Sequence, residues 1–406
     1  MLSSRGINKL LPTSPMVRVL SLMTLVNALG NGLFVTVSTL FFIRSVGLTV
    51  SQVGVGMAVG GVCGIVAGFP MGKLSDRYGA RRVVVCLLLL EAVLIVGYTQ
   101  VHSFGMFVAV ACVVTFLDRG ASAVRSALIG QALPAESRVH GRAYIRSMTN
   151  IGMGVGAAIA GIALHFDTPS AYRAMVFADA LTFLAAALLL LRIPTSSGAA
   201  AHAQSPEDRR KPLRDFRYLL VTLLNAVLTL QMGILQVGFP VWVAYHTDAP
   251  RIIISAAFFV NTALVVLLQV RASRGTEDPL RAARACFIAG LLLAAACVAY
   301  GVMGHLGVAS AAAVAIAATI ALTWGEMLSA AGGWSLSYEL SDEQSIGAYQ
   351  GIYNSGFAAG LLFAPLVITQ TALRFGMAGW AGLGALFLVS GLMLIPATRW
   401  ALAHQA

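Results

Sequence analysis

Residues Gly56–Arg82 read GMAVGGVCGIVAGFPMGKLSDRYGARR, an apolar run with regularly spaced glycines and a charged end. In a helix, glycines spaced four apart lie along one stripe, where the lack of side chains lets a neighbouring helix backbone come close. Such packing holds helices together in lipid, because lipid provides no hydrophobic force between them. The stretch therefore predicts a membrane helix followed by a charged, tight turn at one membrane face. The glycines of this stripe are Gly56, Gly60, Gly64, Gly68 and Gly72.

The charged end of this stretch resembles the signature loop between helices 2 and 3 of the major facilitator superfamily of secondary transporters. That loop usually reads Gly-x-Leu-Ala-Asp-Arg-x-Gly-Arg-Arg/Lys. The matching residues are Gly72, Leu74, Asp76, Arg77, Gly79, Arg81 and Arg82.

The resemblance implies a conformational latch. The Asp76 carboxylate would lie near the cytoplasmic start of helix 11, close to Ser345, where the positive end of the helix dipole attracts it. Arg77 and Arg81 would add charge pairs, and the latch would favour the outward-facing state. Its residues would be Gly72, Asp76, Arg77, Gly79 and Arg81.

The composition indicates an integral membrane protein. Of the 406 residues, 58% are hydrophobic and only 11% are charged, whereas a soluble domain carries about 25% charged residues. Apolar runs recur at the length of about 20 residues that one membrane-spanning helix needs. We predict an all-α integral membrane protein with roughly twelve transmembrane helices. The resemblance implies that they form two pseudo-symmetric six-helix bundles of the major facilitator fold. The expected helices cover residues 17–43, 50–72, 82–101, 104–133, 142–165, 171–193, 217–245, 250–271, 282–304, 308–337, 345–371 and 375–398.

One long polar break divides the chain. It predicts an N-terminal six-helix bundle at residues 1–193, a cytoplasmic linker at 194–216 and a C-terminal six-helix bundle at 217–406. Helices 5 and 11 share the spacing Asn-x-Gly-x-x-x-Gly, as a duplicated transporter should. Helix 5 also resembles a degenerate form of the superfamily's antiporter motif, Gly-x-x-x-Gly-Pro-x-x-Gly-Gly, with Ala157 in place of the proline. The glycines expected to pack these helices closely are Gly152, Gly156, Gly356 and Gly360.

The positive charges predict the orientation. Most of the 27 Lys and Arg residues fall in alternate loops on one side of the predicted membrane. By the positive-inside rule, both termini and the linker are therefore cytoplasmic. This distribution also accounts for the net charge of +11 without nucleic acid. The preference for Arg over Lys, with many Ala and Gly residues, fits a GC-rich bacterial genome, so we expect the bacterial plasma (inner) membrane. The other side carries Arg44, Arg173, Arg251 and Arg374.

Glu326 is the first candidate for proton coupling. An ionisable group at mid-membrane is costly, so it usually faces protein or water and often serves function. Glu326 lies midway along helix 10 in the string Gly-Glu-Met-Leu, which resembles the helix 10 pattern of proton-coupled multidrug antiporters. Proton entry there could be tied to release of a cationic substrate. The alternative is a packing carboxylate that hydrogen-bonds a polar neighbour.

Three further residues complete the predicted proton-coupling set. Asp118 and Arg119 are adjacent in helix 4, and since neighbouring positions point about 100° apart they need not pair. An arginine in this helix belongs to the proton-relay motif Arg-x-x-x-Gly of related antiporters, which the sequence matches poorly. Glu91 lies in the middle of helix 3, where the alternative is a structural carboxylate buried against helix 2 or a partner. We expect Asp179 in helix 6 to make a structural contact.

The resemblance implies that helices 1, 4, 7 and 10 line a substrate cavity. Amides beside apolar and aromatic walls suit a partly hydrophobic organic molecule. The alternative for any single amide is a hydrogen bond between helices. The predicted cavity residues are Asn27, Asn31, Asn225, Gln231, Gln236, Trp324, Tyr353 and Asn354.

These observations predict a secondary active transporter, with proton-coupled efflux of amphipathic organic compounds or drugs by rocking of two halves around a central site. The first alternative is a proton-coupled transporter of one specific metabolite, and the second is a transporter-like sensor without flux. The sequence lacks the common phosphate-binding and hydrolase motifs, so we expect no enzyme and no catalytic residue. We expect no metal and no cofactor, with the proton gradient as the energy source. The expected partners are the substrate, protons and the lipid bilayer, and we expect a functional monomer.

Overall fold

The computed structural model describes residues 15–166, 168–192 and 212–404, and all regular elements in these ranges are helical. The described residues contain eleven helical stretches that are long and apolar enough to cross a membrane. The predicted linker at 194–216 lies mostly outside the described residues, as does the chain before residue 15. The predicted boundaries of the two halves therefore stay a prediction.

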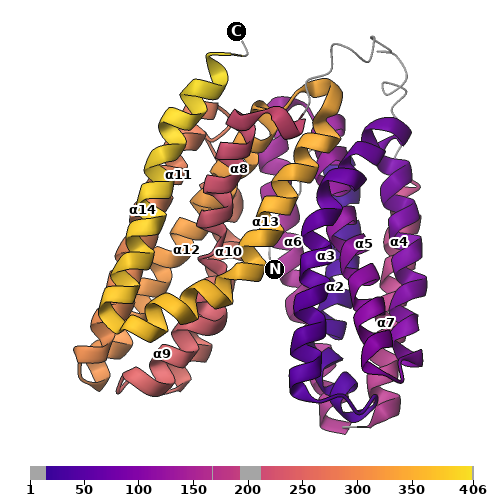
Figure 1. Ribbon diagram of the computed structural model, residues 1–406, viewed down its shortest axis with the longest axis horizontal. Helices are drawn as coiled ribbons and strands as arrows, with labels where there is room; N and C mark the ends of the chain where they lie inside the picture. Colours follow the sequence, from indigo (N-terminus) through magenta and orange to yellow (C-terminus); the bar gives the residue numbers. More distant parts are fainter. Residues whose placement is uncertain (1–14, 167, 193–211, 405–406) are drawn as a thin grey trace, which may run out of the picture. The chain divides into compact units, whose positions relative to one another are not determined.

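The chain forms two compact units. The first unit contains the described residues up to 192 and also Glu343–Ser355, which comes much later in the sequence. In it, α2 contacts α6 and α7, α3 contacts α5, and α4 contacts α5 and α7. Its helices are α2 (Pro15–Arg44), α3 (Val50–Tyr78), α4 (Ala80–Gly97) with the 3-10 turn Tyr98–Gln100, α5 (Phe104–Ala132), α6 (Ala135–Phe166) and α7 (Pro169–Leu190) (Figure 1).

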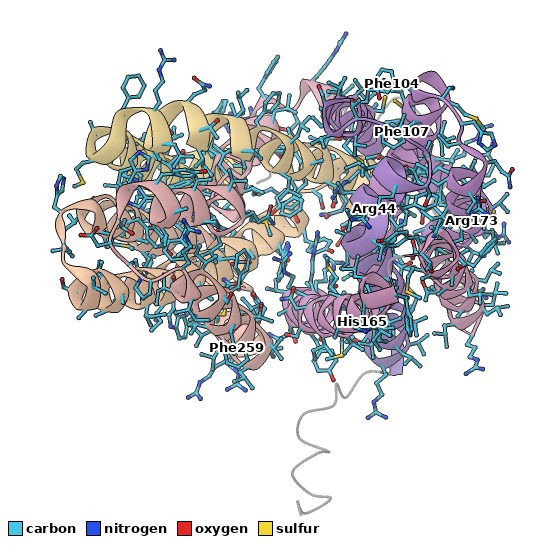
Figure 2. All side chains as sticks on the ribbon, turned by 90° about the horizontal axis from the view of Figure 1, so that it is seen from below. Arg44, Phe104, Phe107, His165, Arg173 and Phe259 are labelled. Atoms are coloured by element: carbon cyan, nitrogen blue, oxygen red, sulfur yellow. The ribbon has the colours of Figure 1, made fainter. Side chains whose placement is uncertain are left out.

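Helix starts in the first unit follow local capping chemistry. Thr49 and Gln52 form a capping box at the start of α3. Ser103 accepts a hydrogen bond from the Met106 N–H at the start of α5. These caps satisfy backbone donors that a helix leaves unpaired in its first turn. Figure 2 views the molecule from the end where α2 stops and α7 begins, marked by Arg44 and Arg173.

The turn between α3 and α4 is shorter than predicted. The sequence pattern placed the end of the helix at Gly72, but α3 continues to Tyr78 and α4 begins at Ala80. Gly79 alone reverses the chain, with a φ of +88° that favours glycine. With 29 residues, α3 is about 43 Å long. Its charged last turns therefore extend beyond a hydrocarbon core of about 30 Å.

The glycine stripe packs against two different helices. Its first three glycines face α5, and a Cβ atom placed on Gly60 would lie 3.1 Å from the Ala111 carbonyl oxygen. Its last two glycines face the start of α13, where a Cβ on Gly72 would lie 3.2 Å from the Gly351 Cα and would collide with the Gly347 carbonyl. Side chains at these positions would force the backbones apart. The sequence predicts the stripe but not this change of partner.

The second unit contains residues 212–342 and 356–404. In it, α11 contacts α12 and α14, α10 contacts α12, and α8 contacts α14. Its elements are the 3-10 turn Pro212–Arg214, α8 (Phe216–Thr229), the π-helical turn η4 (Ile234–Gly238), α9 (Phe239–His246), α10 (Ile252–Ala272), α11 (Pro279–Val302), the 3-10 turn Met303–His305, α12 (Val308–Glu339), most of α13 (Ile346–Ile368), the π-helical turn η7 (Thr369–Leu373) and α14 (Arg374–Leu402). The 3-10 turn Glu343–Ser345 precedes α13 and lies in the first unit.

The predicted helix at 217–245 is interrupted. It ends as α8 at Thr229 and resumes through η4 into α9. Pro240 has no N–H to donate, which weakens regular α-helical bonding at this point. A Cβ on Gly233 would lie 2.8 Å from the Cβ of Ala364, so the interrupted region packs tightly against α13. Such π-turns inside helices are frequent at functional sites.

The last candidate span, Glu343–Leu402, is 60 residues long and contains both α13 and α14. Gly376 in this stretch has a φ of +58°, outside the helical range. Figure 1 shows the chain reversing direction between the two helices.

The predicted helix-packing glycines of the first unit lie between α6 and α2. A Cβ on Gly152 would lie 2.6 Å from the Leu25 carbonyl oxygen, and one on Gly156 would collide with the Leu29 carbonyl oxygen. Neither position has room for a side chain, so α2 and α6 approach each other backbone to backbone.

The glycines of the second copy of the repeat make the matching contact in the second unit. A Cβ on Gly356 would lie 2.6 Å from Thr222 Cγ2, and one on Gly360 would lie 2.6 Å from the Ala226 carbonyl oxygen. These contacts join α13 to α8. The fifth and eleventh predicted helices thus pack on the first and seventh, and the repeat in sequence is also a repeat in packing.

Candidate functional site

The first unit places the Asp76 carboxylate at the start of α13. Its Oδ1 accepts a hydrogen bond from the Gly347 N–H at 2.7 Å, and its Oδ2 accepts one from the Ala348 N–H at 2.8 Å. These are backbone donors that the first helical turn leaves unpaired. The negative charge also meets the positive end of the helix dipole. The carboxylate therefore holds the end of α3 against the start of α13.

The contact needs glycine on both sides. A Cβ on Gly347 would collide with the side chains of Ser75 and Asp76 and with the Gly72 carbonyl oxygen. Ser75 is buried and donates a hydrogen bond from its Oγ to that same carbonyl at 2.7 Å. A side chain at position 347 would therefore push Asp76 away from its two donors.

The two arginines of the predicted latch, Arg77 and Arg81, make other contacts than the predicted charge pairs. Arg81 donates from Nε to the Leu190 carbonyl at 3.1 Å and from Nη2 to the Leu191 carbonyl at 2.6 Å. These carbonyls lie at the C-terminal end of α7, where a cation is favoured by the helix dipole. The Arg77 guanidinium lies 5.3 Å from the ring centre of Tyr78.

Arg142 and its partners are a feature that sequence reasoning missed. Arg142 Nη1 donates to Gln350 Oε1 at 3.3 Å, and its guanidinium lies 5.9 Å from the ring centre of Tyr353. Asn354 Nδ2 donates to Ser126 Oγ at 3.2 Å and to the Gln350 carbonyl at 2.7 Å. The predicted cavity residues Tyr353 and Asn354 are thus buried in contacts of the first unit. The local sequence gives no signal for this contact, because the partner Gln350 lies 208 positions later in the chain.

Asp118 and Arg119 do pair, although they are adjacent on α5. Arg119 Nε lies 3.7 Å from Asp118 Oδ2, and the two side chains are 39% and 32% exposed for Arg119 and Asp118 respectively. A Cβ on Gly64 would lie 2.8 Å from Arg119 Cγ. The glycine stripe of α3 therefore leaves the space in which the Arg119 side chain lies. From this space the Arg119 guanidinium reaches Asp118.

Glu326 in the second unit lies in a polar cluster. Its Oε2 accepts a hydrogen bond from Asn261 Nδ2 at 3.0 Å, and the same amide donates to Thr323 Oγ1 at 3.0 Å. Thr323 is buried one turn before Glu326 on α12, and its hydroxyl donates to the Thr319 carbonyl at 2.7 Å. Asn261 comes from α10. The predicted cavity residue Trp324 packs beside these residues, against the buried cluster Val265, Ala272 and Met327.

The remaining predicted cavity residues have different surroundings. In the second unit, Asn225 is buried and donates to the Val221 carbonyl of its own helix at 3.0 Å. Gln231 is buried just after α8 ends, and Gln236 is exposed within η4. In the first unit, Asn27 is buried on α2 and Asn31 is half-buried one turn later.

Glu91 is among the most buried charged residues of the first unit. Its side chain is 1% exposed, and neither carboxylate oxygen has a hydrogen-bond partner among the described residues. It lies on α4, which contacts α5 and α7 more extensively than α3. Asp179 on α7 is also fully buried.

Comparison with known proteins agrees with this architecture. The sequence profile of the Major Facilitator Superfamily matches residues 20–365. No significant match was found among curated proteins.

Solved transporter structures share the fold. A bacterial homologue of the iron transporter ferroportin, in an outward-facing state, has a TM-score of 0.73 at 15% identity, over 96% of this chain and 100% of that chain. The human organic anion transporter MFSD10 (TETRAN) has a TM-score of 0.67 at 16% identity, over 93% and 98%. The proton:xylose symporter XylE, bound to 6-bromo-6-deoxy-D-glucose, has a TM-score of 0.65 at 14% identity, over 93% and 94%. Since the profile covers most of the chain and the helices have membrane-spanning length, this multi-pass membrane protein belongs to the major facilitator superfamily of transporters.

Proposed function

We propose that this protein is a proton-coupled antiporter that expels amphipathic organic compounds by alternating access. The observation that carries the proposal is the Glu326 carboxylate, which accepts a hydrogen bond from Asn261 in the middle of a membrane helix. An ionisable group at such a depth is costly and is usually kept for function.

Protonation would change this cluster in a defined way. The ionised Glu326 only accepts hydrogen bonds, whereas the protonated acid gains an O–H donor. Asn261 and Thr323 are positioned to respond, because the Asn261 amide donates to both Glu326 and Thr323. The ionised form attracts a cationic group and the protonated form releases it. Proton and substrate would therefore compete for one carboxyl group, which is the requirement for exchange.

The polar side chains favour a partly hydrophobic substrate. Asn31 and Asn27 in the first unit, and Trp324 beside Glu326 in the second, are candidate contacts. A few amides with an aromatic wall can orient an organic molecule while most of its surface stays in apolar contact. Arg119, with its partner Asp118, is a candidate for a second charged contact that proton movement could alter.

The membrane topology that we propose has twelve crossings. The stretch Glu343–Leu402 has 60 residues, and a straight helix of that length would extend about 90 Å, three times a hydrocarbon core of about 30 Å. Counting α13 and α14 separately gives twelve, an even number that leaves both termini in the cytoplasm. We place the protein as a monomer in a bacterial plasma membrane.

A transporter of one specific metabolite is the second candidate. The structures that share its fold include a proton:xylose symporter and an organic anion transporter. Arg119, which is 39% exposed, would offer such an anion one charged contact. Selective saturation by a single compound would favour this function.

The test is transport by purified protein in proteoliposomes under an imposed pH gradient, with lipophilic cations and neutral drugs as substrates. The variant Glu326→Gln should abolish gradient-driven flux while substrate binding survives. The control Glu136→Gln makes the same chemical change at an exposed carboxyl group in the first turn of α6, and it should transport normally. Equal flux by wild type and Glu326→Gln would refute coupling through Glu326. Flux of none of these compounds would favour the metabolite transporter.

A further inference from the structure

Three buried carboxylate oxygens in the first unit have no hydrogen-bond donor among the described residues. Both Glu91 oxygens and Asp179 Oδ2 are buried and have no hydrogen-bond partner among the described residues. The Glu91 side chain is 1% exposed and the Asp179 side chain 0%. A buried ionised carboxylate without donors is strongly disfavoured, and such a group takes up a proton instead.

The helices around Asp179 are shaped to accept it. A Cβ on Gly30 of α2 would collide with Asp179 Oδ1 and with Thr182 Oγ1. Thr182 donates its hydroxyl to the Asp179 backbone carbonyl at 2.8 Å and approaches Oδ1 at only 3.5 Å. Gly30 therefore leaves a recess in α2 that the Asp179 carboxyl group fills. Asn27, one turn earlier on α2, adds another buried oxygen without a donor in the described chain, its Oδ1.

The charged groups that act on Glu91 come from α5 and α7, two of the helices packed against α4. They are Asp118 and Arg125 on α5 and Asp179 on α7. Two of these three are acidic, so an ionised Glu91 would face repulsion as well as the loss of water. Arg125 is the cation, and its Nη1 is itself buried without an acceptor in the described part of the chain.

We infer that Glu91 and Asp179 form a second proton-binding site, inside the first unit and separate from Glu326, with a proton on each carboxyl group. Each proton neutralises one carboxyl group by itself. A bound metal ion would instead require several oxygens to converge on one point. The presence of these protons does not depend on the proposed transport function. Only a role for them in transport rests on that function.

Arg125 gives proton release a structural consequence. When Glu91 loses its proton, the carboxylate becomes an acceptor with a full charge, and Arg125 carries a buried donor that no described residue accepts. Formation of an ion pair between them would draw α4 and α5 together. Loss of a proton from Glu91 would thus favour a different packing of these two helices, which is what a proton-driven conformational change needs.

Infrared spectroscopy of the purified protein at neutral pH tests the site directly. A protonated carboxyl group has its own carbonyl stretching band, which shifts on exchange into D2O. Wild type should show this band, Glu91→Gln and Asp179→Asn should each lose part of it, and the double variant should lose both parts. The control Glu136→Gln should leave the band unchanged. An unchanged band in both single variants would overturn the inference.

Two further measurements distinguish protons on Glu91 and Asp179 from a proton on Glu326 and from a sodium ion. Infrared spectra of Glu326→Gln show how much Glu326 contributes to the carbonyl band. Failure of the transport proposal and failure of this inference are therefore distinguishable. Thermal unfolding in detergent, in NaCl and in choline chloride, tests for a sodium ion. Stabilisation by Na⁺ that Glu91→Gln abolishes would replace the proton with a sodium site. Glu91→Gln imitates the protonated acid and should fold, so a variant that does not fold would also overturn the inference.

Discussion

Glu91 in the first unit and Glu326 in the second are both carboxyl groups midway along apolar helices, but their surroundings differ. Glu326 is half-buried and accepts a hydrogen bond from Asn261. Glu91 is fully buried, and the described residues offer it no donor. Burial without a donor disfavours the charged form of a carboxyl group. The same residue type at a similar depth therefore has a polar partner in one unit and no described donor in the other, and the neighbouring helices make the difference.

The largest effect should come from a permanent charge at the more buried position. Glu91→Lys would place an unpaired cation among α4, α5 and α7, close to Arg125. We expect a loss of roughly 3 kcal/mol or more in stability, or failure to fold. Glu326→Lys should be tolerated better because its site is half-buried and polar. Thermal unfolding in detergent would compare the two, and equal destabilisation would show that the two surroundings do not differ.

The recess for Asp179 should be nearly as sensitive. Gly30→Ala introduces a methyl group where Asp179 and Thr182 already lie, and such overpacking costs about 1–3 kcal/mol. The matched control is Gly154→Ala in α6, where a Cβ meets nothing within 4 Å. There alanine should stabilise the helix by roughly 0.5–1 kcal/mol. The temperature of thermal unfolding should therefore fall in Gly30→Ala and rise in Gly154→Ala. A higher unfolding temperature in Gly30→Ala would argue against a filled recess.

Removal of the donor should make Glu326 more like Glu91. Asn261→Ala takes away the hydrogen bond to Glu326 Oε2, and a hydrogen bond to a charged group contributes about 1.5–3 kcal/mol. We expect gradient-driven flux to fall by roughly tenfold, because the Glu326 carboxyl group loses the amide that holds it in position. Gln100→Ala, which removes an exposed amide, should leave the flux unchanged. Undiminished flux in Asn261→Ala would mean that the amide does not position Glu326.

The smallest effect is expected at Asp76, a carboxylate that has two backbone donors. Asp76→Asn keeps the shape but removes the charge at the start of α13 and one of the two acceptors. The loss should be about 1 kcal/mol, or roughly a fivefold change in the ratio of conformational states. Accessibility of a single introduced cysteine to a membrane-impermeant thiol reagent would report this ratio. Glu136→Gln, at an exposed carboxyl group in the first turn of α6, is the control, and an equal change there would count against a specific role for Asp76.

Much of the fold could be predicted from hydrophobic runs, because a chain in lipid must satisfy its backbone within each helix. The predicted helices agree with the observed ones within a few residues at most ends. The exceptions are the long α3, the early start of α6 at Ala135 and the interruption after Thr229. Each depends on packing or on local backbone chemistry. The interruption lies beside Gly233 and Pro240, whose effect depends on how closely α13 approaches.

The candidate site was less predictable than the helices. The signature string indicated a contact of Asp76 near Ser345, and the structure places the carboxylate at Gly347 and Ala348. The same string did not indicate that Arg81 would bind the carbonyls at the end of α7. Motif spacing reports which residues share a helix face, but a long arginine side chain can reach several partners, and its choice depends on which helix end lies within reach.

Composition and periodicity are enough to show that this chain is a helical membrane protein with a duplicated glycine pattern and a small number of membrane carboxyl groups. Each of these properties is local to one helix. The folded arrangement is needed to see that Asn261 donates to Glu326, that Gly30 makes room for Asp179, and that Glu91 has no donor among the described residues. Those properties depend on side chains from other helices, and in a buried site the neighbours decide whether a carboxyl group is charged.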